Sequence, residues 1–468
     1  MMRMGRRVCV AGALVAFVGA ARDARAAGFA TQHFGGEQGS VVATNPTALY
    51  YNPGAIGFSE GIHLYVDGDI ALRHATWNHV APQPGPSDPV DQQAGNTGEA
   101  HLFNVFAGPS LAATGKFGNF AIGAGLFVPF GGRVQWSSSD NTDLAYPLTA
   151  GGVQRWHIIN AALTFVQVSA GAAYKLGPLS IGATGNFINS QITESQARTV
   201  PGNVDSTAEN TAHLAVSGNN GSFAAGAMLE AIPNRLWLGG SYQAQPGMGE
   251  QVLKGTFTFN AGPVPQYEPH LPLVQKVDFH ESLPDIIRAG IKLRATDNFE
   301  LRLFGDLTRW SKLTSQCINV DSGGSQSCVV HANGTDATPN LSVIANIVRN
   351  WKDTYGAHLG GSYWFSPGVE VFAGAGYETG AAPDATMEPG AMDGNNVTAS
   401  LGGRFLIANY VYLAASYTQI QFFDRNVTDS QLAVANGKAL ALPTQQQDGN
   451  GQYTQWVGFF DVNLEKQF

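Results

Sequence analysis

Hydrophobic and polar residues alternate along many short stretches of the chain after residue 26. In residues 62–73 the apolar members of the alternation are Ile62, Leu64, Val66, Ile70 and Leu72. The same pattern recurs in residues 287–295, 301–307 and 369–378. A period of two places successive side chains on opposite faces of a strand. Each run is about ten residues, the length with which a tilted strand crosses a bilayer. The pattern therefore predicts strands with one apolar and one polar face.

Short turns and long polar segments separate the predicted strands. The turns are Gly118-Asn119, Gly177-Pro178, Pro233-Asn234, Asp297-Asn298, Ser366-Pro367 and Ala408-Asn409. The long segments are residues 77–98, 129–154, 311–350 and 424–452. A soluble β-sandwich would share the alternation, but short turns at one end and long loops at the other are typical of an outer-membrane barrel. We expect tryptophans near strand ends to form an interfacial girdle, namely Trp77, Trp136, Trp156, Trp310, Trp351 and Trp364.

The last predicted strand reaches the C-terminus. One face of it carries Trp456, Gly458, Phe460, Val462, Leu464 and Phe468. A final strand that ends in phenylalanine resembles the sorting signal of bacterial outer-membrane barrels, so we expect the barrel-assembly machinery to recognise Phe468. The predicted fold is an all-β, transmembrane antiparallel barrel of roughly twelve to sixteen strands, with an even number expected.

Composition favours the same class. Of 468 residues, 13% are charged and 44% are hydrophobic, and 57 are glycine. The charged fraction is about half the usual ~25%, and no run of 18 apolar residues follows residue 26. These values argue against a nucleic-acid-binding protein, a helical membrane protein and a disordered chain.

The N-terminus has the three parts of a secretory signal peptide, which we place at residues 1–26. Basic residues precede an apolar stretch, Val8 to Ala21, and Ala24-Arg25-Ala26 forms a cleavage site. The alternative is a short anchor helix, but the stretch is too short to span a bilayer. Cleavage would leave 26 − 5 = 21 basic and 35 − 1 = 34 acidic residues, a net charge of −13.

Two cysteines remain after cleavage, Cys317 and Cys328, on either side of a polar stretch. Export to an oxidising compartment predicts a disulfide between them. A metal site is the alternative, but only His331 is near enough in sequence to add a ligand.

Residues 27–60 lack a sustained strand pattern and are rich in glycine and proline. Their large apolar residues are Phe29, Phe34, Tyr50, Tyr51, Ile56 and Phe58. A flexible periplasmic tail would not carry so much apolar surface. We therefore predict a hatch that plugs the lumen, followed by a barrel over residues 61–468.

The third predicted strand, residues 120–130, contains Gly123, Gly125 and Pro129. Glycine weakens a strand, and proline removes a ladder hydrogen bond. These residues form the candidate lateral gate, a gap through which an apolar ligand leaves into lipid. The alternative is an ordinary strand end in which glycine allows close packing.

Apolar residues within long polar segments mark candidate binding surfaces. The ligand-binding candidates are Phe29, Phe130, Trp136, Arg155 and Trp156. Arg155, Arg288 or Arg302 could pair with a ligand carboxylate, although lumen charges in barrels more often pair with one another. Loop self-packing and contact with outer-membrane lipid or lipopolysaccharide remain open for these segments. The sequence has no G-x-S-x-G elbow, H-E-x-x-H motif or P-loop, so we expect neither an enzyme nor a bound cofactor or metal.

Several motifs together resemble the FadL/TodX outer-membrane transporters of hydrophobic compounds. Their order along the chain is Ala27-Gly28-Phe29, Tyr50-Tyr51-Asn52-Pro53-Gly54-Ala55, Phe127-Val128-Pro129-Phe130-Gly131, Leu283-Pro284-Asp285, Trp310-Ser311-Lys312 and Trp351-Lys352-Asp353-Thr354. The Asn52-Pro53-Gly54 segment is similar to the family's Asn-Pro-Ala hatch motif, with a glycine before the alanine.

The resemblance implies a monomeric, 14-stranded barrel in the bacterial outer membrane, plugged by the N-terminal hatch. It also implies passive uptake of long-chain fatty acids or similar hydrophobic molecules, with lateral release into the membrane. The alternatives are a general porin for polar solutes and a surface adhesin or structural barrel that transports nothing.

Overall fold

The computed structural model describes residues 38–79, 97–137, 151–199, 209–260, 273–321, 328–329, 343–432 and 448–468. The predicted signal peptide and the beginning of the predicted hatch with Phe29 lie outside these residues. So do most of residues 432–442, an apolar stretch within the long segment 424–452 that is a further candidate binding surface. No helix among the described residues is long and apolar enough to cross a membrane.

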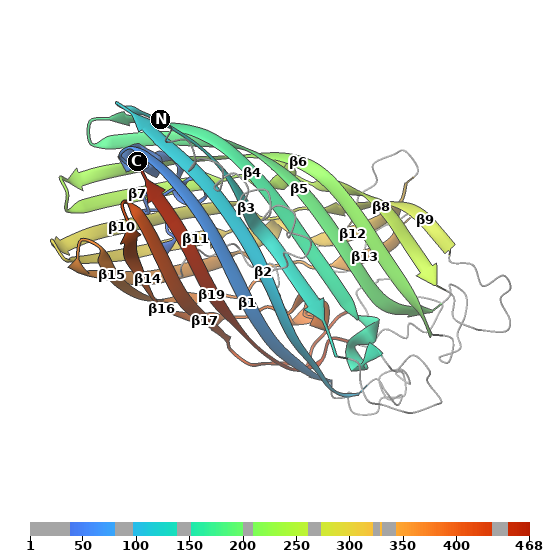
Figure 1. Ribbon diagram of the computed structural model, residues 1–468. Coiled ribbons are helices and arrows are strands. Elements are labelled where there is room, and N and C mark those ends of the chain that lie inside the picture. The colour runs from blue at the N-terminus through green and yellow to red at the C-terminus, as the bar shows by residue number, and fades with distance from the viewer. Residues whose placement is uncertain are drawn as a thin grey trace, which may run out of the picture.

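The strands form one closed antiparallel barrel (Figure 1). Its wall consists of β1 (Ile62–His79), β2 (Gly98–Phe117), β3 (Phe120–Gln135), β4 (Asn160–Leu176), β5 (Leu179–Thr199), β6 (Glu209–Ile232), β7 (Leu236–Gln243), β10 (Ile286–Thr296), β11 (Phe299–Thr308), β14 (Thr354–Ser366), β15 (Val369–Glu378), β16 (Asn396–Ala408), β17 (Val411–Phe422) and β19 (Gly451–Gln467). β1 pairs with both β2 and β19, which closes the ring. The barrel has fourteen strands (7 + 2 + 4 + 1), the number that the family resemblance implies.

Five further strands extend the wall at one end. They are β8 (Gln251–Asn260), β9 (Leu273–Glu281), β12 (Ser315–Val320), β13 (Val343–Val348) and β18 (Arg425–Val427). β8 and β9 pair with each other, and β12 joins β9 to β13. Short helical or irregular segments separate these strands from the wall below, among them η6 (Pro246–Met248) and η7 (Trp310–Lys312). Four neighbouring strands of the ring are therefore interrupted before they reach that end, namely β7, β10, β11 and β14.

The six predicted turns connect strands at the opposite end of the barrel, on the left in Figure 1. The backbone N–H of Phe468 donates to Ile62 O at 2.9 Å, so the C-terminus lies at this end too. The longer described connections, such as residues 379–395 between β15 and β16, lie at the other end. Short turns face the periplasm in outer-membrane barrels, which sets the orientation of the chain.

The outer face of the wall is apolar, as the alternation predicts. In β1 the side chains of Ile62, Leu64 and Val66 are exposed, whereas His63 and Tyr65 between them are buried. In β19 the same holds for Phe460 and Val462, which are exposed. The exposed apolar positions face lipid, and the polar positions face the lumen.

The predicted tryptophan girdle is wrong. Trp77, Trp136, Trp156, Trp310 and Trp351 are between 0% and 7% exposed, and Trp364 packs beneath the Arg294 guanidinium at 5.1 Å. These positions follow the lumen-facing alternation or belong to segments folded over the lumen. The exposed aromatic residues near the short turns are Phe117, Phe120, Tyr174, Tyr363, Phe365 and Tyr410.

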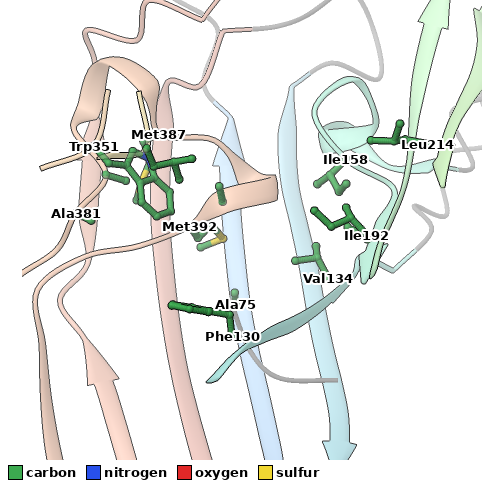
Figure 2. Packing of buried hydrophobic residues seen from close by; sticks show 14 of the residues in the cluster. Ala75, Phe130, Val134, Ile158, Ile192, Leu214, Trp351, Ala381, Met387 and Met392 are labelled. Atoms are coloured by element: carbon green, nitrogen blue, oxygen red, sulfur yellow. The ribbon is translucent and has the colours of Figure 1, made fainter. Parts of the chain in front are cut away.

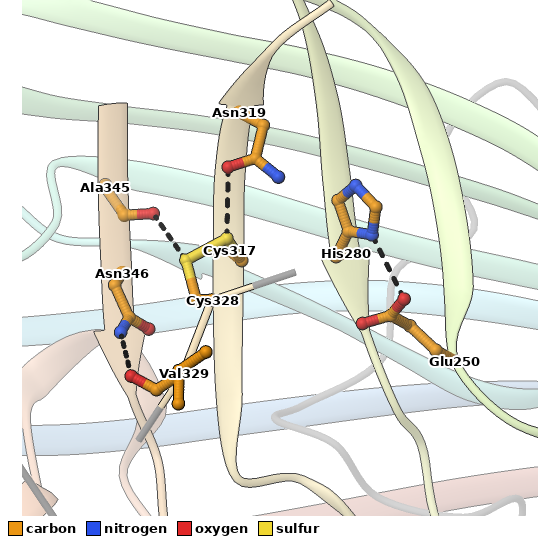
Figure 3. Close-up of a disulfide and its surroundings, with 8 residues drawn as sticks. All are labelled: Glu250, His280, Cys317, Asn319, Cys328, Val329, Ala345 and Asn346. Atoms are coloured by element: carbon orange, nitrogen blue, oxygen red, sulfur yellow. Dashed lines mark hydrogen bonds and ion pairs between the residues drawn. A yellow bond between two sulfur atoms is a disulfide. The ribbon is translucent and has the colours of Figure 1, made fainter. Parts of the chain in front are cut away.

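A disulfide joins Cys317 of β12 to Cys328, with Cα atoms 5.5 Å apart (Figure 3). The Cys328 Sγ lies 3.8 Å from the carbonyl oxygen of Ala345 in β13. The bridge therefore holds the chain that follows β12 against the strand that pairs with it, at the loop end of the barrel.

Candidate functional site

The hydrogen-bond ladder between β2 and β3 is open over part of its length. It runs from Phe117↔Phe120 to Leu111↔Leu126 and stops there. Beyond it, β2 stays paired with β1, and β3 stays paired with β4. The two strands meet again where the side chain of Asn104 donates to Gln135 O and accepts from Gln135 N, both at 3.0 Å. We call the interval the lateral gap; it has residues 105–110 on β2 and 127–134 on β3.

The course of β3 causes this gap. The register between β3 and β4 shifts between Phe127 and Phe130, at the position of Pro129. Proline has no N–H to donate to a neighbouring strand. Four successive residues, 129–132, are buried, so this part of β3 no longer alternates between lipid and lumen and passes into the barrel.

The three candidate gate residues lie at different levels. Pro129 is within the lateral gap, whereas Gly123 and Gly125 pair with β2 below it. A Cβ at Gly123 would come 2.9 Å from Leu49 Cδ1, and one at Gly125 would come 2.6 Å from Phe127 Cζ. The two glycines therefore leave room for side chains inside the lumen.

An apolar cluster fills the lumen behind and above the gap. Its members come from β1 to β6, from the interrupted strands and from the segments over the barrel. Figure 2 shows Phe130 and Ala75 on one side and Trp351 with Met387 and Met392 on another, around the same interior. The predicted ligand-binding residues Phe130 and Trp136 belong to this lumen cluster.

The other two described candidates, Arg155 and Trp156, belong to η5 (Val153–Trp156), whose first residue is in the lumen cluster. Both side chains are buried. The Arg155 guanidinium donates to Gly152 O at 3.2 Å and lies over the Trp156 ring at 5.5 Å. The structure thus brings Phe130, Trp136 and η5 to the same end of the lumen.

Aromatic rings cross the lumen from the kinked strand to the opposite wall. Phe130 contacts Phe165 of β4 edge-on, with ring centroids 6.1 Å apart. On its other side Phe130 contacts Trp310 at 6.2 Å, and Trp310 contacts Trp351 at 5.0 Å. Trp310 follows β11, which is six strands from β3 in a ring of fourteen. Phe130 stays paired with Phe165 of β4, so its contact with Trp310 links two wall segments that are six strands apart.

Residues 38–58 lie inside the barrel at the turn end. They include α2 (Ala48–Tyr51) and η3 (Pro53–Phe58), whose residues are almost all buried. The Tyr50 ring contacts Phe127 of β3 at 5.7 Å, and the Arg288 guanidinium of β10 lies over Tyr50 at 5.1 Å. This segment thus touches both the kinked strand and the far wall.

Asn52 holds the segment in place. Its amide group donates to Val41 O at 2.8 Å and to Ala227 O of β6 at 3.0 Å, and its Oδ1 accepts from Gly54 N at 3.1 Å. A Cβ at Gly226 would come 2.1 Å from Asn52 Oδ1. Glycine in the wall is therefore required for the close approach of Asn52, which explains part of the glycine content of the chain.

Arg73 is a lumen residue that the sequence argument missed. It is 1% exposed on β1, between Ala71 and Ala75 on the same face. Its Nε and Nη2 donate to Gln455 Oε1 at 3.2 and 2.6 Å. Among the described residues its Nη1 has no hydrogen-bond partner and no carboxylate forms an ion pair with it. Arg73 pairs in register with Asn104, at the upper edge of the lateral gap. Only the strand register reveals this position.

A buried polar network lies beside the lumen cluster at the loop end. Glu388 accepts hydrogen bonds from Arg349 and, at 3.2 Å, from His157. Burial by itself would raise the pKa of Glu388, but the Arg349 charge and the His157 hydrogen bond together lower it to about 2. Arg349 also donates to Gln316 of β12 at 2.8 Å. The network ties the segment after β15 to η5 and to the extended strands.

A polar cavity of about 460 Å³ lies at the turn end, between residues 38–60 and the wall. Its charged residues are Glu60, His63, Lys292, Arg294, Glu300, Arg302, Glu370, Arg404 and Glu465. Arg302 donates to Gln38 at 2.6 Å and to Ser362 at 2.6 Å, and Arg404 pairs with Glu465 at 2.8 Å. The proposed lumen arginines Arg288 and Arg302 are therefore held by neighbours of the protein itself.

Known structures share this architecture. A FadL homologue from Pseudomonas aeruginosa is 18% identical, with a TM-score of 0.73 over 95% of this chain and 100% of that one. The toluene transporter TbuX of Ralstonia pickettii is 15% identical, with a TM-score of 0.60 over 91% of this chain and 94% of its own. The toluene transporter TodX of Pseudomonas putida is 14% identical, with a TM-score of 0.61 over 95% and 97%. At these identities the likeness establishes the fold.

Comparison with curated protein sequences finds no match. The sequence profile of one family, described as outer membrane protein transport protein (OMPP1/FadL/TodX), matches residues 8–454. That match covers nearly the whole chain and agrees with the closed barrel. The chain belongs to the OMPP1/FadL/TodX family of outer-membrane transport proteins.

Proposed function

We propose that this protein carries long-chain fatty acids, or hydrophobic molecules of similar shape, from outside the cell into the outer membrane through the lateral gap. The observation that carries the proposal is the end of β2–β3 pairing at Leu126. Behind that opening lies the lumen cluster, to which Phe130 belongs. An apolar lumen that opens sideways offers a hydrophobic molecule a path that avoids water.

The interior supports a passive route in two stages. The ligand first contacts Trp136, Arg155 and Trp156 at the loop end, and it then moves along the lumen cluster to Phe130, which borders the gap. Residues 27–60 act as the hatch that keeps the ligand from continuing to the periplasm, with Asn52, Pro53 and Gly54 at its centre. Partition into the membrane supplies the driving force, since burial of apolar surface is favourable by about 25 cal/mol per Å².

Arg73 suits the polar end of such a ligand. Arg73 lies at the upper edge of the gap with its Nη1 buried, and a carboxylate there would form a charge-assisted hydrogen bond with it. A neutral hydrocarbon would gain nothing from this group. The presence of Arg73 therefore favours a carboxylate-bearing hydrophobe over a plain hydrocarbon, although toluene is the compound that the two named transporters above carry.

The test is uptake of radiolabelled oleate by bacteria that lack their own long-chain fatty-acid transporter, with and without this protein. Heat-dependent gel mobility must show in parallel that the barrel is folded. Restored uptake supports the proposal. A folded barrel without oleate uptake rejects fatty acids; uptake of toluene instead would redirect the substrate to aromatic compounds, and uptake of neither would favour the porin or adhesin alternatives.

A further inference from the structure

Three metal-binding side chains meet on the lumen face of three adjacent strands. Asp306 belongs to β11, His358 to β14 and Glu378 to β15. In the strand register, Gly356 pairs with both Asp306 and Glu378, and His358 is two residues further along β14. The three candidate ligand atoms lie within 4.8 Å of one another.

The distances in this group differ from those of ordinary histidine–carboxylate pairs in the same protein. His358 Nε2 lies 3.7 Å from Asp306 Oδ1 and 3.5 Å from Glu378 Oε1. The four other described pairs with a buried histidine are shorter: His63–Glu465 at 2.7 Å, His79–Asp448 at 3.1 Å, His157–Glu388 at 3.2 Å and His280–Glu250 at 3.2 Å. Both separations from His358 Nε2 are therefore longer than those of the four other pairs.

This spacing fits two ligands of one metal ion. Zn²⁺ binds histidine nitrogen and carboxylate oxygen at about 2.0–2.2 Å with tetrahedral geometry. Two tetrahedral ligands at that length lie roughly 3.3–3.6 Å apart, close to the separations around His358 Nε2. The Phe304 ring stacks on His358 with centroids 4.9 Å apart, which fixes the plane of the imidazole.

Glycines keep the space between the ligands open. A Cβ at Gly356 would come 2.4 Å from Asp306 Oδ1 and 3.0 Å from His358 Nε2. A Cβ at Gly376 would come 2.3 Å from His358 Nδ1. A Cβ at Gly356 would therefore enter the space between the ligand atoms, and one at Gly376 would press on the other nitrogen of the imidazole ring.

We propose that Asp306, His358 and Glu378 bind a divalent transition-metal ion of the Zn²⁺ type inside the barrel. Nitrogen and carboxylate oxygen donors suit such an ion. Three protein ligands leave a fourth position for water or for an oxygen of a molecule in the lumen. Arg288 of β10 also acts on Asp306 electrostatically, so a metal ion competes with the positive charge of Arg288 for the Asp306 carboxylate. The site is independent of the lateral gap and of fatty-acid transport.

Titration calorimetry with ZnCl₂ on the tag-free, detergent-solubilised barrel tests the proposal, with Co²⁺ absorption as a second probe. We expect one ion per chain and the visible bands of tetrahedral Co²⁺. His358→Gln should weaken binding at least about ten-fold, by the loss of a direct ligand. Gly356→Ala should do the same without changing any ligand, because its Cβ enters the site.

Two matched variants serve as controls. Gly185→Ala adds a Cβ that would meet nothing within 4 Å, and His280→Gln removes a buried histidine that contacts a single carboxylate. Both should bind Zn²⁺ like the unmodified protein. If His358→Gln does not show the gel mobility of a folded barrel, Glu378→Gln is measured in its place. Equal Zn²⁺ binding by the unmodified protein and the ligand variants would overturn the proposal.

Discussion

The ring of Phe130 meets the ring of Trp310 edge-on across the lumen, with centroids 6.2 Å apart and planes inclined by 74°. Phe130 belongs to the kinked part of β3, and Trp310 to the segment that interrupts the wall after β11. Two local irregularities in distant strands therefore depend on each other, because each supplies the ring that the other packs against.

This contact predicts an energetic coupling between the two residues. Phe130→Ala and Trp310→Ala should each destabilise the barrel, and the double variant should lose less than the sum by about 0.5–1.5 kcal/mol, the value of an aromatic pair. Urea unfolding in lipid vesicles, followed by far-UV circular dichroism, measures the three changes in free energy. Strict additivity would mean that the kink is held without this contact.

The lateral gap predicts that equalising the strand lengths closes it. Between Leu126 and Gln135, β3 has eight residues against six on β2, residues 105–110. Deletion of Val128 and Pro129 leaves six on each strand, and removal of two residues preserves which side chains face inward. The deletion leaves one extra residue, Val166, on β4, which a bulge can absorb. Oleate uptake should fall to background in a folded barrel.

Pro129→Ala is the matched control for this deletion. It restores a backbone N–H but keeps eight residues on β3, so the gap should persist and uptake should be largely retained. Uptake that survives the deletion in a folded barrel would exclude lateral release between β2 and β3.

The wall of the barrel could be predicted because it obeys local rules. The alternation in β1 and β19 and the six turns need only residues that are neighbours in sequence. The inward orientation of the tryptophans could not be predicted in this way, because a tryptophan near a strand end can face either lipid or the lumen. The strand register decides which of the two it faces. Asp306, His358 and Glu378 are separated by up to 72 positions (378 − 306). They meet only because β11 pairs with β14, across the extension formed by β12 and β13.

Arg73 predicts a difference between charged and neutral ligands. Arg73→Gln should reduce oleate uptake about ten-fold, the equivalent of roughly 1.4 kcal/mol, within the range of one hydrogen bond to a charged group. Uptake of oleyl alcohol, which has no carboxylate, should be unchanged. Arg73→Lys keeps the positive charge and should retain part of the oleate uptake. Equal losses for both ligands would mean that Arg73 has only a structural role.

Glu388 predicts a loss of stability in acid. Its pKa is about 2 in the folded protein, below its usual value of 4.5. A lowered carboxyl pKa stabilises the fold above the usual value, and this contribution disappears as the pH falls from about 4.5 to about 2. Pepsin is itself more active at pH 2 than at pH 4, so its cleavage of the loop end is divided by its cleavage of an unfolded substrate at the same pH. This ratio should be higher at pH 2. Glu388→Gln should abolish that difference and cost about 3–5 kcal/mol at pH 7, because Arg349 stays buried without its partner.

The hydrogen bonds of Asn52 lead to a prediction about the proposed hatch. Its side chain satisfies two buried carbonyl oxygens and one N–H. Asn52→Ala removes all three hydrogen bonds at a cost of about 1–3 kcal/mol for each group left unsatisfied. Deletion of residues 27–60 removes the described residues 38–58, which lie inside the barrel at the turn end. In planar lipid bilayers we expect a closed unmodified barrel, brief openings for Asn52→Ala and a steady conductance for the deletion.

Thr44→Ala is a matched control, because Thr44 borders the polar cavity at the edge of the same segment. It should stay closed. A deletion variant that folds and still does not conduct would show that residues 27–60 are not the barrier, and the lumen cluster around Phe130 would then be the element that blocks passage.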